Sequence, residues 1–268
     1  MPDAQITVAS GHAGRLAVHR WSAERPTRVV LLAHGYGEHA GRYDHVARRL
    51  ADEGALVVAP VHAGHGRSDG ERALIVDVEL LVDDLAAVGA AAIGELPGAP
   101  VVLVGHSLGG IVATRLAQRG ALPLRALALS GPVIGGNPEL LALAELDPIP
   151  DVPIDPAILS RDPAVGEAYA ADALVHHGPF RVETLRAVAA AVDAIAAGPR
   201  LTGLPLLWLH GEEDGLAPLA VTEPVVTDLG AASLERHVYP GARHEVLNET
   251  NRDEVLDHLA AFVAREGA

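Results

Sequence analysis

The chain has no cysteine among its 268 residues. This absence excludes disulfides, thiol nucleophiles and thiolate metal sites. Apolar residues make up 49% of the chain, yet no apolar run reaches the roughly 18 to 20 residues that a membrane-spanning helix needs. The amino terminus lacks a basic start followed by an apolar stretch, so we expect no secretory signal and a soluble, cytoplasmic protein.

Positive charge is also scarce. Lysine and arginine together number 20 against 35 aspartates and glutamates, and the formal net charge is −15. Because nucleic-acid binding needs clustered positive charge, we expect no nucleic-acid partner. The length is enough for one large core with an inserted lid, and less suited to two independent domains.

A Gly-His-Ser-Leu-Gly motif at 105–109 follows the apolar run 101–104 and opens a helix-like stretch. A strand that turns sharply into a helix needs glycines beside the turn residue, because side chains there would clash and hide the serine hydroxyl. This arrangement predicts that Ser107 is a nucleophile. A second match at 66–70 has no apolar strand before it, so Ser68 is interpreted as a loop serine.

Short apolar runs alternate with segments of helical period, which is typical of a parallel sheet covered by helices on both faces. Strands are expected at 27–33, 55–59, 101–104, 124–129, 204–209 and 234–239, and helices at 42–54, 77–96, 108–120, 217–230 and 249–265. The stretches 5–9 and 15–21 alternate polar and apolar residues around a glycine-containing turn, as an antiparallel edge hairpin would. The pattern predicts an α/β fold with about eight strands.

The alternation of strand-like and helix-like segments stops between residues 132 and 200, a segment rich in proline. Asn137-Pro138 and Asp162-Pro163 suit the start of helices, and a third helix is expected after Phe180. We interpret 132–200 as a cap inserted into a core formed by 1–131 and 201–268. The apolar residues of the cap can pack on the core, line an acyl pocket, or do both.

A serine hydroxyl needs a histidine to take its proton and a carboxylate to orient that histidine. In the doubly wound hydrolase arrangement, the acid and then the histidine follow the nucleophile along the chain. His244 follows the strand 234–239, and Asp214 follows the strand 204–209, with Glu212 and Glu213 as competing acids.

The other histidines are expected to be surface or packing residues. His237 lies in a strand, His258 lies on the last helix, and His106 points away from the nucleophile. His62 and His65 have no evident third ligand, so we expect no metal site. Nothing in the predicted chemistry needs a cofactor.

Acyl transfer also needs hydrogen-bond donors for the developing oxyanion. The turn His34-Gly35-Tyr36-Gly37 directly follows the strand 27–33. We predict that the backbone N–H groups of Tyr36 and Leu108 form the oxyanion hole.

Several strings resemble those of the monoacylglycerol lipases, particularly the bacterial branch. They are 34–43 (HGYGEHAGRY), 105–110 (GHSLGG), 160–163, 174–178, and 239–249 with its histidine. The resemblance covers most of the chain. It implies an α/β-hydrolase fold with a lid, cleavage of the single ester of a monoglyceride, Asp214 as the acid, and recognition of the alcohol near Glu38 and Arg42.

The chain departs from this family at three places. Val61 and Ala63 stand where the family has Asp and Arg, a pair thought to brace the loops near the oxyanion hole. The cap is short between residues 136 and 155. Leu247 occupies a position that is polar in some relatives that bind glycerol there.

The leading hypothesis is therefore a serine esterase acting on monoacylglycerols, with transient membrane contact through the apolar cap. Within enzymes, the alternatives are a general carboxylesterase, a lysophospholipase and an aminopeptidase, because the fold supports all of them. From another class, the alternative is an inactive ligand-binding relative. Haloalkane or epoxide chemistry is disfavoured, because those relatives have a carboxylate where Ser107 stands.

Overall fold

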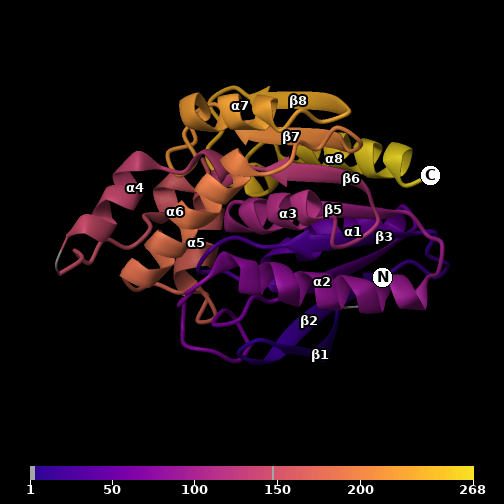
Figure 1. Cartoon of the computed structure of the whole chain (residues 1–268), viewed down its shortest axis with the longest axis horizontal. Coiled ribbons are helices and arrows are strands. Elements are labelled where there is room, and N and C mark those ends of the chain that lie inside the picture. Colours follow the sequence, from indigo (N-terminus) through magenta and orange to yellow (C-terminus); the bar gives the residue numbers. More distant parts are fainter. Residues whose placement is uncertain (1–3, 147) are drawn as a thin grey trace.

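The computed structural model describes residues 4–146 and 148–268. Within these ranges one eight-stranded sheet crosses the molecule in the order β1-β2-β4-β3-β5-β6-β7-β8 (Figure 1). β2 pairs antiparallel with both β1 and β4, and the remaining neighbours are parallel. The strands are β1 (Gln5–Gly11), β2 (Gly14–Ser22), β3 (Arg28–Ala33), β4 (Ala55–Pro60), β5 (Val101–His106), β6 (Leu124–Ser130), β7 (Pro205–Gly211) and β8 (Ser233–Tyr239). This sheet confirms the predicted fold class and the edge hairpin.

Helices cover both faces of the sheet. They are α1 (Asp44–Asp52), α2 (Val78–Glu95), α3 (Leu108–Arg119), α4 (Pro138–Ala142), α5 (Pro163–Ala171), α6 (Val182–Ala197), α7 (Leu219–Asp228) and α8 (Arg252–Glu266). Along β3, Val29 and Leu31 pack into a core with α2, α3 and α6, whereas Val30 and Leu32 pack into a core with α1 and α8. Successive strand residues face opposite sides, so the continuous apolar runs are explained by burial on both faces.

The helices start and end close to where the sequence predicts. The Asp77 side chain accepts a hydrogen bond from the Glu79 N–H and caps α2, and Gly120, with a left-handed φ of 60°, caps the carboxyl end of α3. The helix expected at 249–265 begins later, at Arg252. The reason is that Glu249 is extended and its carboxylate accepts the N–H groups of Arg243 and Arg161.

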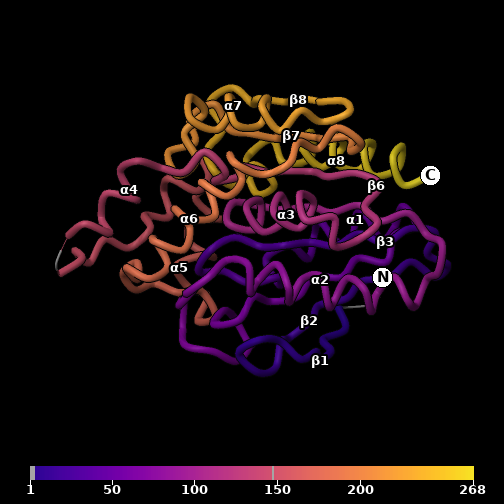
Figure 2. Tube along the Cα trace, in the orientation of Figure 1, coloured from indigo at the N-terminus to yellow at the C-terminus, as the bar shows by residue number. Residues whose placement is uncertain are grey.

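The segment between β6 and β7 contains α4, α5 and α6 together with short 3-10 turns, and has no strand among its described residues. The 3-10 turns of the chain are η1 (Ala40–Tyr43), η2 (Val133–Gly135), η3 (Leu143–Glu145), η4 (Pro156–Ile158) and η5 (Val246–Asn248). Figures 1 and 2 show α4, α5 and α6 gathered at one end of the sheet, away from both chain termini. Asn137 and Asp162 cap α4 and α5 as expected. α6 also packs into the core through Ala187, Ala191 and Ile195, so the last part of the expected cap is continuous with the core.

The turn from β5 into α3 is tightly packed against the end of β3. A Cβ added at Gly109 would lie 2.1 Å from the carbonyl oxygen of Ala33, and one at Gly105 would lie 2.4 Å from the carbonyl oxygen of Gly109. Ser107 between them has a φ of 53°, a conformation that costs energy for residues other than glycine. α3 therefore sits close enough to β3 and β5 to force Ser107 into this strained turn.

We predict that Gly109→Ala lowers the free energy of unfolding by about 3 kcal/mol or more, because the new methyl group meets backbone that cannot move aside. The matched control is Gly94→Ala in α2, where a Cβ meets nothing within 4 Å. This control should raise the free energy of unfolding by about 1 kcal/mol through helix propensity. Urea denaturation measures both values, and equal effects of the two substitutions would contradict the packing argument.

Candidate active site

Ser107, His244 and Asp214 form a continuous hydrogen-bonded chain. The Ser107 Oγ lies 2.8 Å from His244 Nε2, and His244 Nδ1 lies 3.0 and 2.8 Å from the two oxygens of Asp214. Because a carboxylate only accepts, Nδ1 carries the hydrogen and Nε2 is free to accept from the serine hydroxyl. The three residues come from the turn after β5 and from the loops after β8 and β7, so the structure brings together side chains that are far apart in sequence.

The carboxylate of Asp214 is itself held in place, since its Oδ1 accepts the N–H groups of Leu216 and Ala217. Burial alone would raise the pKa of Asp214, but the interaction with His244 lowers it below its ordinary value. Burial alone would lower the pKa of His244, but Asp214 first, and then Glu245 and Glu38, raise it overall. The electrostatics therefore favour an ionised acid beside a histidine that gains a proton readily.

The predicted oxyanion donors lie on the same cavity as Ser107. Tyr36 and Leu108 both line it. Leu108 is the first residue of α3, where N–H groups have no acceptor within the helix. Gly35, next to Tyr36, lies close to the nucleophile, because a Cβ added there would be 3.2 Å from the Ser107 Cβ. The arrangement leaves backbone donors beside the serine, and their role in binding an oxyanion stays a prediction.

Two buried histidines hold the turn that carries Tyr36. The His62 N–H donates to His34 Nε2 at 2.9 Å, and the His62 Nε2 donates to the His34 carbonyl at 3.1 Å. His34 Nδ1 in turn donates to the Gly35 carbonyl. Burial lowers the pKa of His62 to about 3, so the pair is neutral. Neutral hydrogen bonds brace this loop next to Val61 and Ala63, which are both buried in the apolar core.

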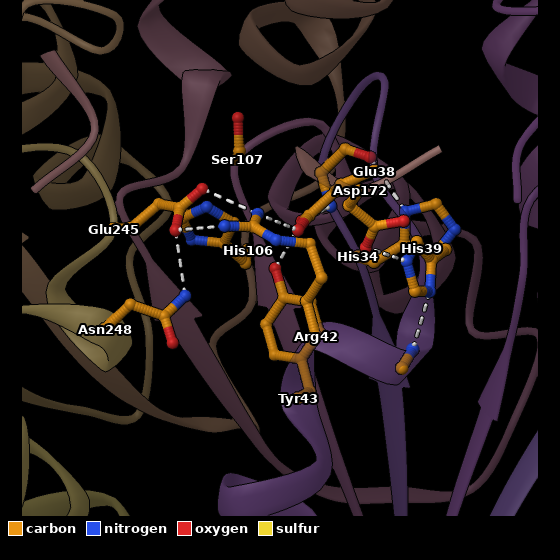
Figure 3. Close-up of polar contacts among 12 residues, drawn as sticks. His34, Glu38, His39, Arg42, Tyr43, His106, Ser107, Asp172, Glu245 and Asn248 are labelled. Carbon is orange, nitrogen blue, oxygen red and sulfur yellow. Dashed lines mark hydrogen bonds and ion pairs between the residues drawn. The ribbon is translucent and has the colours of Figure 1, made fainter. Parts of the chain in front are cut away.

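Glu38, Arg42 and Glu245 form a buried ion-pair cluster near Ser107 (Figure 3). Arg42 donates to Glu38 at 2.6 Å and to both oxygens of Glu245 at 2.7 and 2.8 Å. Glu38 also accepts the Gly35 N–H and the Tyr43 hydroxyl. The cluster thus ties the loop after β3 to the loop that carries His244, while both Glu38 and Arg42 line the cavity.

The cavity above Ser107 is mainly apolar. Its empty space, including the part that opens to solvent, is about 770 Å³. The expected cap supplies much of its wall, including Leu140, Ile154, Leu159, Tyr169 and Phe180. The aromatic ring of Phe180 stacks on Tyr36 with 5.2 Å between the centroids. Apolar side chains therefore surround the space above the serine.

Other candidates from the sequence lie elsewhere or have structural roles. The Ser68 hydroxyl donates to the Val61 carbonyl and accepts the Ala17 N–H, so it is fully engaged in a loop. His106 Nδ1 hydrogen bonds the Ser130 carbonyl. Leu247 is buried and does not line the cavity. The described part of the chain has no group of three or more potential metal ligands, and none of its helices is long and apolar enough to cross a membrane.

Sequence reasoning assigned no role to Glu245, although it contacts the cavity and pairs with Arg42 across 203 positions. The only signal was its place directly after His244. It also gave no role to Tyr169, whose ring lies 5.1 Å from the guanidinium of Arg42. Both contacts depend on loops that meet only in the folded chain.

A mostly parallel sheet with a serine at a strained strand-to-helix turn, followed along the chain by an acid and a histidine, defines an α/β-hydrolase with the site of a serine hydrolase. Residues 24–251 match the family model described as "Serine aminopeptidase, S33". The chain belongs to this family of serine hydrolases.

Named relatives fall in the same group. The chain is 36% identical over 259 residues to the monoacylglycerol lipase of Mycolicibacterium smegmatis, covering 93% of this chain and 92% of that one. It is 32% identical to human monoglyceride lipase, covering 84% and 77% of the two chains. The crystal structure of Paleococcus ferrophilus monoacylglycerol lipase superposes with a TM-score of 0.81 at 26% identity, over 94% of this chain and 99% of that one. These similarities confirm the family resemblance stated from the motifs.

We predict that kcat/KM for an ester falls at low pH with a midpoint above 6.5, the ordinary pKa of histidine, because the pKa of His244 is raised and only its neutral form accepts a proton. A pH series measured with an uncharged ester tests this. A wild-type midpoint clearly below 6.5 would contradict the electrostatic argument.

Asp214→Asn should lower kcat by roughly 10⁴-fold, because the histidine loses its orienting acceptor.

Proposed function

We propose that this chain hydrolyses the single ester bond of monoacylglycerols, releasing a fatty acid and glycerol through an acyl-enzyme. The observation that carries the proposal is the Ser107–His244–Asp214 chain at the wall of a mainly apolar cavity. The relatives named as monoacylglycerol and monoglyceride lipases over most of the chain support the substrate class. The apolar walls suit one acyl chain, and no cofactor is needed.

In this mechanism the Ser107 Oγ attacks the ester carbonyl while His244 Nε2 takes its proton. The N–H groups of Tyr36 and Leu108 stabilise the oxyanion. As the tetrahedral intermediate collapses, the proton on His244 passes to the leaving glycerol oxygen. Water then attacks the acyl-enzyme with His244 again as base, and the fatty acid leaves as Ser107 regains its proton.

The acyl chain lies against the apolar part of the cavity beneath residues of 132–200, which act as a cap. Glycerol faces the polar part near Glu38 and Arg42. In the structure Glu38 and Arg42 are engaged with each other, and Arg42 is also engaged with Glu245, so their contribution to alcohol binding acts through the cluster as a whole.

The enzymatic alternatives are a general carboxylesterase, a lysophospholipase and an aminopeptidase. Steady-state kinetics on monoacylglycerols, p-nitrophenyl esters of graded length and an aminoacyl anilide separate them. We expect monoacylglycerols to have the highest kcat/KM. A preference for the anilide or for short p-nitrophenyl esters would overturn the proposed substrate class.

The non-enzymatic alternative, an inactive ligand-binding relative, predicts no covalent labelling. We expect a fluorophosphonate probe to modify the folded wild-type protein at Ser107. Ser107→Ala should lose the labelling and lower kcat by about 10⁶-fold. Ser68→Ala is the matched control, because Ser68 lies in the second motif and should leave labelling intact. Labelling that persists in Ser107→Ala would contradict the assignment.

We further propose that the protein touches lipid surfaces transiently through the tip of the cap. Leu146 and Val152 are 51% and 47% exposed there. The transfer of exposed apolar side chains from water into a lipid interface is favourable. The net charge of −15 favours neutral over anionic membranes. A cytoplasmic location stays a prediction from the sequence.

The double substitution Leu146→Ser and Val152→Ser should weaken sedimentation with phosphatidylcholine vesicles by about tenfold, from the lost apolar burial. Val76→Ser is the control, because Val76 is 61% exposed and lies outside the cap. Equal vesicle binding by wild type and the double variant would exclude the cap tip as the contact.

A further inference from the structure

We infer that the buried cluster of Glu38, Arg42 and Glu245 makes the enzyme select against leaving groups that carry negative charge. Esters of uncharged glycerol are then good substrates, and lysophospholipids with an anionic headgroup are poor ones. This inference rests on the proposed function and specifies its leaving group. It assigns to Glu245 a role in specificity.

The charge of the cluster follows from its hydrogen bonds. Glu38 Oε1 accepts from the Gly35 N–H and the Tyr43 hydroxyl, while Oε2 accepts from Arg42. The two oxygens of Glu245 each accept from Arg42, and Oε2 also accepts the Asn248 amide. Direct contact with the guanidinium, which is always charged, favours the ionised form of both carboxylates. Two ionised carboxylates therefore share one guanidinium, and the cluster carries a net charge of −1.

No other charge in the cavity wall compensates this. Among the described residues that line the cavity, Arg42 is the only arginine, and the chain contains no lysine. His106, which lies beside the cluster in Figure 3, is neutral, because burial and the nearby His244 lower its pKa to about 4. The imidazolium formed by His244 during the reaction is matched by Asp214. The excess negative charge therefore remains.

Burial makes this charge effective at a distance. Glu38 and Glu245 are only 3% and 4% exposed, so water and salt screen them weakly. Both carboxylates also lie close to the reacting groups. Glu245 directly follows His244 in the chain, and Glu38 accepts a hydrogen bond from the Gly35 N–H. The apolar walls take the acyl chain, and the leaving group is left to face the cluster. A phosphate on that leaving group would be repelled.

Arg42 alone would be expected to attract an anionic leaving group, whereas the cluster as a whole is expected to repel it. A free arginine in a cavity wall attracts phosphate, often with two parallel hydrogen bonds. Here the guanidinium is already engaged by three carboxylate oxygens. The positive charge of Arg42 is balanced by one carboxylate, and the second carboxylate leaves a net negative charge. The site as a whole therefore disfavours anions.

The test compares kcat/KM for monooleoylglycerol, oleoyl lysophosphatidylglycerol and a monooleoylglycerol glucoside, all in the same neutral detergent micelles at one pH. The glucoside is an uncharged control for headgroup size. We expect the anionic ester to be at least about tenfold worse than the glucoside, as for like charges brought together at an interface. Glu245→Gln should reduce this ratio by at least about threefold, because it removes the excess charge. Glu167→Gln, an exposed carboxylate on α5, should leave the ratio unchanged.

Salt separates the buried cluster from the general field of a chain with a net charge of −15. Discrimination that comes from the surface should fade between about 0.05 and 0.5 M salt, whereas that from buried carboxylates should persist. This measurement needs only the wild-type protein. It therefore tests the inference even if Glu245→Gln does not fold.

Equal rates on the anionic ester and the glucoside would overturn the inference. So would discrimination that disappears with salt, or a folded Glu245→Gln variant with the wild-type ratio. Each of these outcomes leaves monooleoylglycerol hydrolysis intact, and with it the proposed function. If none of the three esters is cleaved, both the proposed function and the inference fail.

Discussion

The close approach of α3 to the carboxyl ends of β3 and β5 is the constraint on which the site depends. Glycines at 105 and 109 allow backbone to meet backbone where any Cβ would clash, and Ser107 between them is held at a positive φ. This strain keeps the hydroxyl at the cavity and places the N–H of Leu108 beside it. A looser junction would relax the turn and separate the Ser107 hydroxyl from the N–H of Leu108.

The parallel sheet explains why the remaining groups arrive at the same place. Carboxyl ends of parallel strands share one edge of a sheet, and the loops after β3, β5, β7 and β8 carry Tyr36, Ser107, Asp214 and His244. α4, α5 and α6 gather at this end (Figure 1). The chemistry is therefore positioned by topology, and the segment between β6 and β7 adds the apolar wall.

Charge around the cavity is divided between neutral histidines and ionised carboxylates. Burial lowers the pKa of His62 to about 3 and of His106 to about 4, so these rings serve as neutral hydrogen-bonding parts. His244 differs because Asp214 contacts it directly and raises its pKa. The same residue type thus has opposite protonation behaviour within one site, and the difference comes from the partner of each ring.

The sequence by itself determined the alternation of strands and helices and the edge hairpin, and it predicts Ser107 rather than Ser68 as the nucleophile, because these inferences depend on local periodicity and on glycine spacing. It also placed Asp214 and His244 after the strands that the structure has as β7 and β8, since order along the chain is a property of this topology. Only the tertiary structure decided that Arg42 is shared by Glu38 and Glu245, that His34 and His62 brace the turn at Tyr36, and that α6 joins the core. Such contacts join loops distant in sequence, and their energies depend on burial and geometry that no local pattern records.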